Sequence, residues 1–121
     1  MAIIVKTENP QELLKLIYKA IDDGHVKTWE YDEAKDFTHI TSDGQWYNKA
    51  WLKPHIDPIA KELKLGILFS RKVEKTKLIY GVYHGRFIEM LLTHFNDSFT
   101  TVLATAQLTR PDLFTEGEKL V

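Results

Sequence analysis

Cysteine is absent from this chain of 121 residues, so a disulfide framework, a thiol nucleophile and a thiolate zinc site are excluded. Proline and glycine are scarce, at 4 and 6 residues, and neither gathers into a linker or a low-complexity segment. The apolar run at the beginning is too short for a signal-peptide core and far shorter than a membrane span. We therefore expect one cytoplasmic domain, residues 1–121, with no membrane contact.

An excess of positive charge is also lacking, because 16 basic and 17 acidic side chains give a formal net charge of −1. Such a balance removes the general attraction to phosphate backbones. One segment does interleave aromatic and basic side chains as single-strand platforms do: Trp46, Tyr47, Lys49, Trp51 and Lys53. Core aromatics with lysines at the rim explain the same pattern, so we expect no nucleic-acid partner.

The chain does have a substantial apolar fraction, 44%, and an aromatic fraction of 12%. A domain of this size can bury enough surface to fold without a metal. Asn9 is a typical helix N-cap residue, and Pro10 suits the first helical position. Glu12, three residues after the cap, can accept a hydrogen bond from the cap's backbone N–H. They predict a helix over about 10–23, which ends before Gly24.

A second helix is predicted over about 85–95, where Phe87, Leu91 and Phe95 lie on one stripe. The pair Asp57 and Pro58 resembles another helix start and predicts a short helix near 57–64. Aromatic and β-branched runs predict strands over 26–31, 37–41, 45–52, 65–72, 77–83 and 99–105. The fold class is therefore α+β, with a mainly antiparallel multi-stranded sheet and both main helices packed on one face.

Two of the predicted strands carry large apolar side chains on both faces. In 45–52, Trp46 and Leu52 alternate with Tyr47 and Trp51, and 77–83 shows the same pattern around Tyr80. Two helices on one face cannot cover both sides of such strands. The second face is thus expected to be a dimer interface, a ligand cleft or a partner site.

The residues Tyr83, His84, Gly85 and Arg86 lie where the predicted strand 77–83 meets the predicted helix 85–95. A phenol, an imidazole and a guanidinium at a helix start can hold an anion, and Gly85 would let a ligand approach the backbone. The alternative is structural: His84 caps the helix, Arg86 pairs with Glu89 and Tyr83 packs in the core.

An oxygen-rich cluster of Asp32, Glu33, Asp36 and His39 contains ligand types that hard cations prefer. Acidic residues are equally common in turns for local hydrogen-bonding reasons, and the spacing does not require the four to converge. We therefore expect neither a metal nor a cofactor. Nucleophile elbows, phosphate loops, dinucleotide fingerprints and zinc-protease helices are absent from the sequence.

Four segments resemble stretches of short bacterial proteins that carry no known activity: WEYD at 29–32, DFTH at 36–39, KAWLKP at 49–54 and VYHGRF at 82–87. The resemblance implies a bacterial cytosolic setting and says nothing about mechanism.

The pattern as a whole favours a noncatalytic binding module that self-associates, most simply as a homodimer, through an aromatic sheet face. The expected contacts are Trp46, Tyr47, Trp51 and Tyr80, with His84 and Arg86 as further binding candidates. Another protein or a small anionic ligand is the other partner class. The alternative function is a small hydrolase or transferase for an anionic substrate, with His84 as acid or base, Arg86 as clamp, and Tyr83 or His39 assisting.

Overall fold

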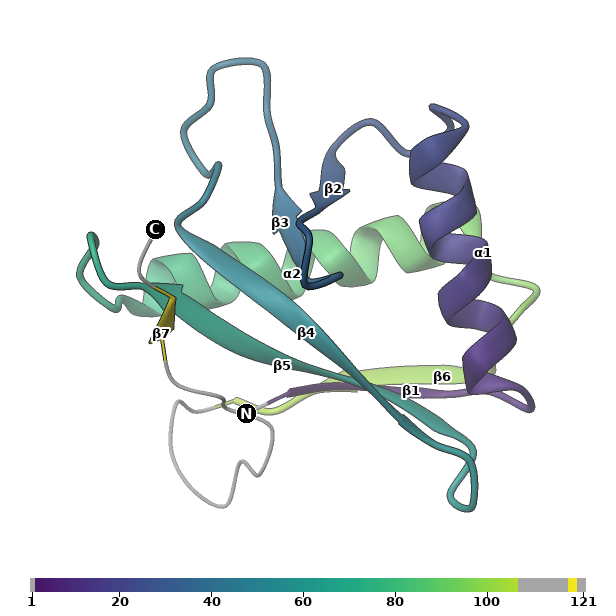
Figure 1. The fold of residues 1–121 in the computed structure, drawn as a ribbon. Helices are drawn as coiled ribbons and strands as arrows, with labels where there is room; N and C mark the ends of the chain where they lie inside the picture. Colours follow the sequence, from purple (N-terminus) through teal and green to yellow (C-terminus); the bar gives the residue numbers. More distant parts are fainter. Residues whose placement is uncertain (1, 107–117, 120–121) are drawn as a thin grey trace.

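The computed structural model describes residues 2–106 and 118–119 (Figure 1). Its elements are β1 (Ala2–Lys6), α1 (Pro10–Asp22), β2 (Trp29–Tyr31), β3 (Phe37–His39), β4 (Ala50–Asp57), β5 (Glu62–Ser70), α2 (Lys77–His94), β6 (Thr101–Ala104) and β7 (Glu118–Lys119). Within the described residues the strands form one sheet in the order β2-β3-β4-β5-β1-β6, and every neighbouring pair is antiparallel. The short strand β7 pairs with the end of β5 in parallel. The α+β fold is confirmed.

Helix α1 begins where its sequence signals predict. The Asn9 side chain accepts a hydrogen bond from the Glu12 backbone N–H at 3.1 Å, and Pro10 occupies the first helical position. Beyond the helix end, Gly24 adopts a φ of +78°, a left-handed conformation that glycine tolerates best.

Helix α2 corrects the predicted strand 77–83, because those residues form the first half of one continuous helix. The Thr76 side chain caps it by accepting from the Ile79 backbone N–H at 3.1 Å. Its buried side chains recur at helical spacing: Ile79, Tyr80, Tyr83, His84, Phe87, Met90 and Leu91. The apolar residues of 77–83 therefore belong to a helix that packs on the core with one face. The predicted strand-to-helix junction does not exist.

The short helix predicted near 57–64 is also wrong, since residues 58–61 form the turn of the β4–β5 hairpin. The Asp57 carboxylate accepts from the Ala60 backbone N–H at 3.0 Å, and Lys61 takes a φ of +55°. Aspartate followed by proline suits a turn as well as a helix start, which explains the error. Likewise residues 45–49 are turns, and β4 begins only at Ala50.

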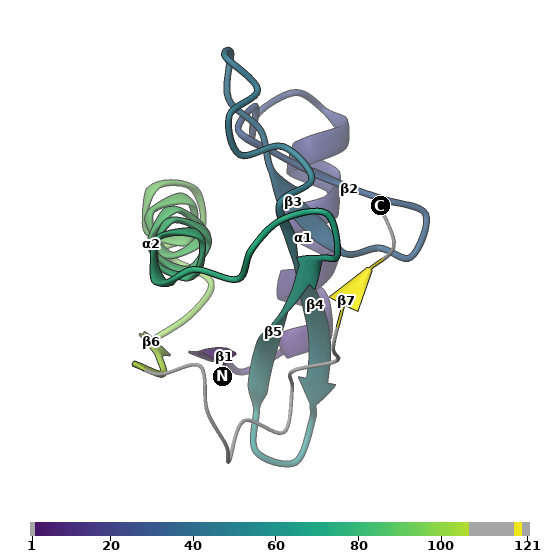
Figure 2. The same ribbon diagram turned by 90° about the vertical axis from the view of Figure 1, so that its left-hand side faces the viewer.

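One hydrophobic cluster contains the buried side chains of both helices and the inward side chains of the strands. It includes Leu13 and Ile17 of α1, Tyr83 and Phe87 of α2, and Leu52 of β4. The predicted packing of both helices on one face is confirmed. Figure 2 shows α2 as an outer layer to the left of β4 and β5.

Trp51 and Leu68 lie on the opposite face of the sheet. They are cross-strand neighbours in β4 and β5, and their sequence neighbours Leu52 and Ile67 point into the main cluster. Both are nevertheless buried, at 1% and 5% exposure. The Lys119 ammonium of β7 lies 5.0 Å from the Trp51 ring centroid, so a segment of the same chain covers this part of the second face.

Candidate functional site

The residues predicted to form an anion site do not converge. His84 is buried, whereas Arg86 is exposed and pairs with Glu89 of the next helical turn at 3.4 Å. In a continuous helix, residues two positions apart point in different directions. The proposed clamp and the proposed acid or base therefore face different surroundings, which contradicts the expected site.

His84 is held by its own helix. Its Nδ1 lies 2.8 Å from the Tyr80 carbonyl oxygen, and its ring stacks on the Tyr80 ring at a centroid distance of 3.9 Å. Because a carbonyl only accepts, Nδ1 must carry the proton, and the buried Nε2 has no hydrogen-bond partner in the described structure. Burial outweighs the bond to Tyr80 and lowers the pKa of His84 to about 4. The imidazole is thus neutral at pH 7.

The two assisting candidates also have internal partners. The Tyr83 hydroxyl donates to the Trp46 carbonyl and lies 3.1 Å from the Thr38 hydroxyl. His39 places Nδ1 2.8 Å from the Thr28 carbonyl, and burial lowers its pKa. The polar atoms of Tyr83 and His39 are thus hydrogen-bonded to neighbouring loops and strands, so neither side chain is presented to a substrate.

The predicted aromatic contact set does not form a single surface. Tyr47 is exposed at 47%, and Trp46 is half-buried against the main cluster. Trp51 and Tyr80 are buried, on opposite sides of the sheet, and Tyr80 hydrogen-bonds the Thr105 carbonyl. The prediction treated 77–83 as a strand and therefore placed Tyr80 in the sheet. In the structure Tyr80 lies on the buried side of helix α2.

The acidic cluster is divided in a similar way. Asp32 and Asp36 share one cation, the Lys119 ammonium, at 2.5 Å and 2.7 Å. His39 points into the core beside Trp29, and Glu33 is exposed. Among residues 2–106 and 118–119, no group of three or more metal-ligating side chains is assembled.

The outer face of α2 is the feature that sequence reasoning missed. Leu78 and Leu92 are exposed at 64% and 54%, although both are large and apolar. Gly81 and Gly85 lie between them, and a Cβ added to either glycine would meet no atom within 4 Å. An open groove along this face is lined by Lys77, Leu78, Gly81, Val82, Gly85, Arg86 and Glu89. The i, i+3 and i+4 spacing of these residues could have revealed the face once the helix was recognised.

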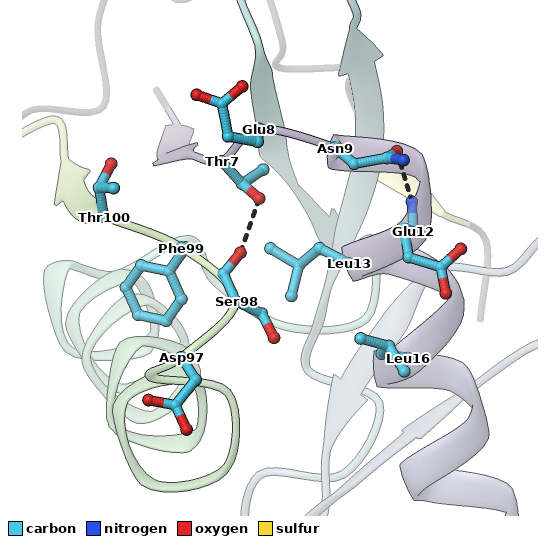
Figure 3. A pocket seen from close by; sticks show the side chains of 10 residues that line it. All are labelled: Thr7, Glu8, Asn9, Glu12, Leu13, Leu16, Asp97, Ser98, Phe99 and Thr100. Atoms are coloured by element: carbon cyan, nitrogen blue, oxygen red, sulfur yellow. Dashed lines mark hydrogen bonds between the residues drawn. The ribbon is translucent and has the colours of Figure 1, made fainter.

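A second pocket lies between the start of α1 and the loop that follows α2 (Figure 3). The Thr7 hydroxyl donates to the Ser98 carbonyl at 2.7 Å and joins its two sides. The acidic side chains Glu8, Glu12 and Asp97 stand around it. Glu8 pairs with Lys61 at 2.8 Å, and the α1 cap is already satisfied by Asn9. The pocket therefore offers negative charge without a buried, unsatisfied group.

Helices long and apolar enough to cross a membrane are not found in the described part of the chain. No protein-family model, curated protein or solved structure matches the chain.

Proposed function

We propose that this protein is a noncatalytic interaction module that self-associates through the outer face of α2. The proposal rests on the exposure of Leu78 and Leu92, which lie on either side of Gly81 and Gly85. A side chain at either glycine would meet no atom of the same chain within 4 Å, so packing within the chain does not explain why these residues are glycine. Each glycine destabilises a helix by about 1 kcal/mol relative to alanine. Close packing of α2 against the backbone of another helix would explain why both positions are glycine.

The outer face is complementary to itself. Leu78, Gly81, Gly85, Ile88 and Leu92 follow one another in alternate steps of three and four residues, which is the seam of a packed helix pair. When two copies are antiparallel with Gly85 against Gly85, Leu78 meets Leu92 of the second copy. Ile88, which is half-buried against the main cluster, then lies across from Val82 and reaches the space over the neighbouring Gly81 of the second copy. Such pairing satisfies the two-fold symmetry of most homodimers.

A parallel arrangement fits this seam less well, because it sets Gly81 against Gly81 and Ile88 against Ile88. The paired Gly81 and Gly85 positions would then leave unfilled space between the two helices, and the paired Ile88 side chains would be too large for theirs. Antiparallel helices also bring opposite ends of their dipoles together. The seam therefore favours the antiparallel pair.

The β6 edge lies on the same side of the molecule as α2 (Figure 2). Within the described residues no strand pairs with the outer edge of β6, and Leu103 of β6 is exposed, so this edge is a candidate for pairing with a strand of the second copy. A stable interface buries roughly 800 Å² per partner, which is more than one helix face supplies. The α2 seam and the β6 edge together form the proposed interface.

Replacing Leu78 with glutamate is expected to abolish self-association, because it places a charge in the apolar seam. Size-exclusion chromatography with light scattering over a concentration series should give a dimer for the parent and a monomer for Leu78→Glu. Ile59→Glu is the matched control, since Ile59 is 94% exposed in the β4–β5 turn, outside the seam. A parent that stays monomeric at high concentration contradicts the proposal.

Gly81→Ala should separate stability from association. We expect it to raise the free energy of unfolding of the monomer by about 1 kcal/mol, because alanine favours the helix and its Cβ has open space. The same methyl group should weaken dimerisation by occupying the space that Ile88 of the second copy fills. Urea denaturation at low concentration and sedimentation velocity measure the two effects. Stabilisation with unchanged association would show that Gly81 lies outside the interface.

A further inference from the structure

The Lys119 ammonium occupies a cage built by other elements. It lies 2.5 Å from an Asp32 oxygen, 2.7 Å from an Asp36 oxygen and 5.0 Å from the Trp51 ring centroid. Two carboxylates and an aromatic face are the groups that recognise a primary ammonium. We call Asp32, Asp36 and Trp51 the ammonium cage.

One wall of the cage is held by local backbone hydrogen bonds that do not involve Lys119. The second Asp32 oxygen accepts from the backbone N–H groups of Ala34 and Asp36, each at 3.0 Å, so the β2–β3 turn fixes this carboxylate. Asp36 and Trp51 are each 1% exposed. Asp36 Oδ1 is buried and has no hydrogen-bond partner in the described structure, which leaves the carboxylate with unused capacity for a donor. The turn thus fixes Asp32 in advance, and β7 fills the cage.

The backbone of β7 uses an available sheet edge. Strand β1 stops pairing with β5 at Gly66, and β7 joins that edge further along, at Phe69 and Ser70. The Arg71 backbone N–H donates to the Lys119 carbonyl at 2.9 Å. Main-chain pairing at a sheet edge combined with a side-chain pocket is the mode in which domains bind extended peptides.

Negative charge continues beyond the cage. An open groove of about 490 Å³ shares Asp32 with the cage and is also lined by Glu30 and Glu33. Lys35 lines the groove too, but its ammonium lies over the Tyr18 and Tyr31 rings, at 5.0 Å and 4.7 Å from their centroids. This negative charge favours a lysine side chain in the bound segment.

We propose that the end of β5 and the ammonium cage form a binding site for an extended, lysine-bearing segment of a partner protein. Strand β7 is the resident occupant of this site and competes with the partner segment. The partner's lysine takes the position of Lys119, and its backbone takes the place of β7 along β5. The proposal does not depend on self-association through α2.

The test uses a fluorescent peptide with the sequence of residues 116–121, EGEKLV, and a control peptide with norleucine in place of its lysine. Fluorescence anisotropy measures binding to the full-length parent and to full-length Lys119→Ala. We expect about tenfold tighter binding to Lys119→Ala, because the internal competitor is weakened. The norleucine peptide should bind at least about tenfold more weakly, since it cannot donate to the carboxylates. Asp36→Asn in the Lys119→Ala background should remove this preference for lysine.

Absence of binding to both proteins, equal binding to both, or equal binding of the two peptides would each overturn the proposal. Circular dichroism verifies that Lys119→Ala is folded. If it is not, Lys119→Gln replaces it, because the shorter glutamine side chain keeps an N–H donor but carries no charge. The same three binding results would then overturn the proposal.

Discussion

Lys119→Ala is expected to lower the free energy of unfolding by about 3 kcal/mol, a large effect for a side chain that is 18% exposed. The Asp36 side chain is only 2% exposed and loses its cation, while Asp32 loses the ammonium at 2.5 Å. Burial alone would raise the pKa of Asp32, but hydrogen bonds from Lys119 and from the turn backbone outweigh it and lower that pKa. Removing the ammonium leaves a buried negative charge unpaired.

Urea denaturation at pH 7 measures this loss, and Lys15→Ala on exposed α1 surface is the control, with an expected change within about 0.5 kcal/mol. Adding Asp36→Asn to Lys119→Ala should recover most of the stability, because the amide is neutral. A Lys119→Ala protein as stable as the parent would mean that β7 does not bridge the two carboxylates.

Acidification is expected to destabilise the protein by about 2.5 kcal/mol between pH 7.5 and 4.5 through His84. The pKa of His84 is about 4 in the folded chain, against a reference value of 6.5. Between those values the unfolded chain binds more protons, so stability is complete above about pH 6.5 and falls as pH decreases towards 4. Protonation would add an N–H at Nε2, which has no acceptor in the described structure.

His84→Phe is the matched variant, because phenylalanine keeps a ring against Tyr80 and does not titrate. Its free energy of unfolding should change much less between pH 7.5 and 4.5. Burial lowers the pKa of His39 as well, so a smaller pH dependence of the same sign should persist. Identical pH profiles for the parent and His84→Phe would show that His84 is not buried in its neutral form.

The fold class and α1 were predictable because their signals are local. Asn9, Pro10 and Glu12 act within one turn, and the structure uses them as the sequence suggests. The first half of α2 was not predictable in this way. Leu78, Ile79 and Tyr80 are apolar in succession, which suits a strand, and only the burial of every third or fourth residue distinguishes the helix.

The candidate sites show the same limit. His84 and Arg86 are only two positions apart in sequence, but the helix turns them in different directions. Asp32 and Lys119 are separated by 87 positions, and the topology of the sheet brings them together. Local patterns supply residue types, whereas contacts at such separations depend on how the strands are ordered. The outer face of α2 could be identified only after the helix was assigned its full length.

Cross-linking between introduced cysteines tests self-association through antiparallel α2 helices most directly, because the chain has no cysteine of its own. An equimolar mixture of Leu78→Cys and Leu92→Cys proteins is oxidised and separated on a non-reducing gel. A disulfide requires Cα atoms within about 7 Å, whereas antiparallel pairing about Gly85 separates Leu78 from Leu78 of the second copy by about 20 Å. We predict a covalent dimer in the mixture and none with either protein alone. No covalent dimer in the mixture, or equal yields from each protein alone, would contradict the account.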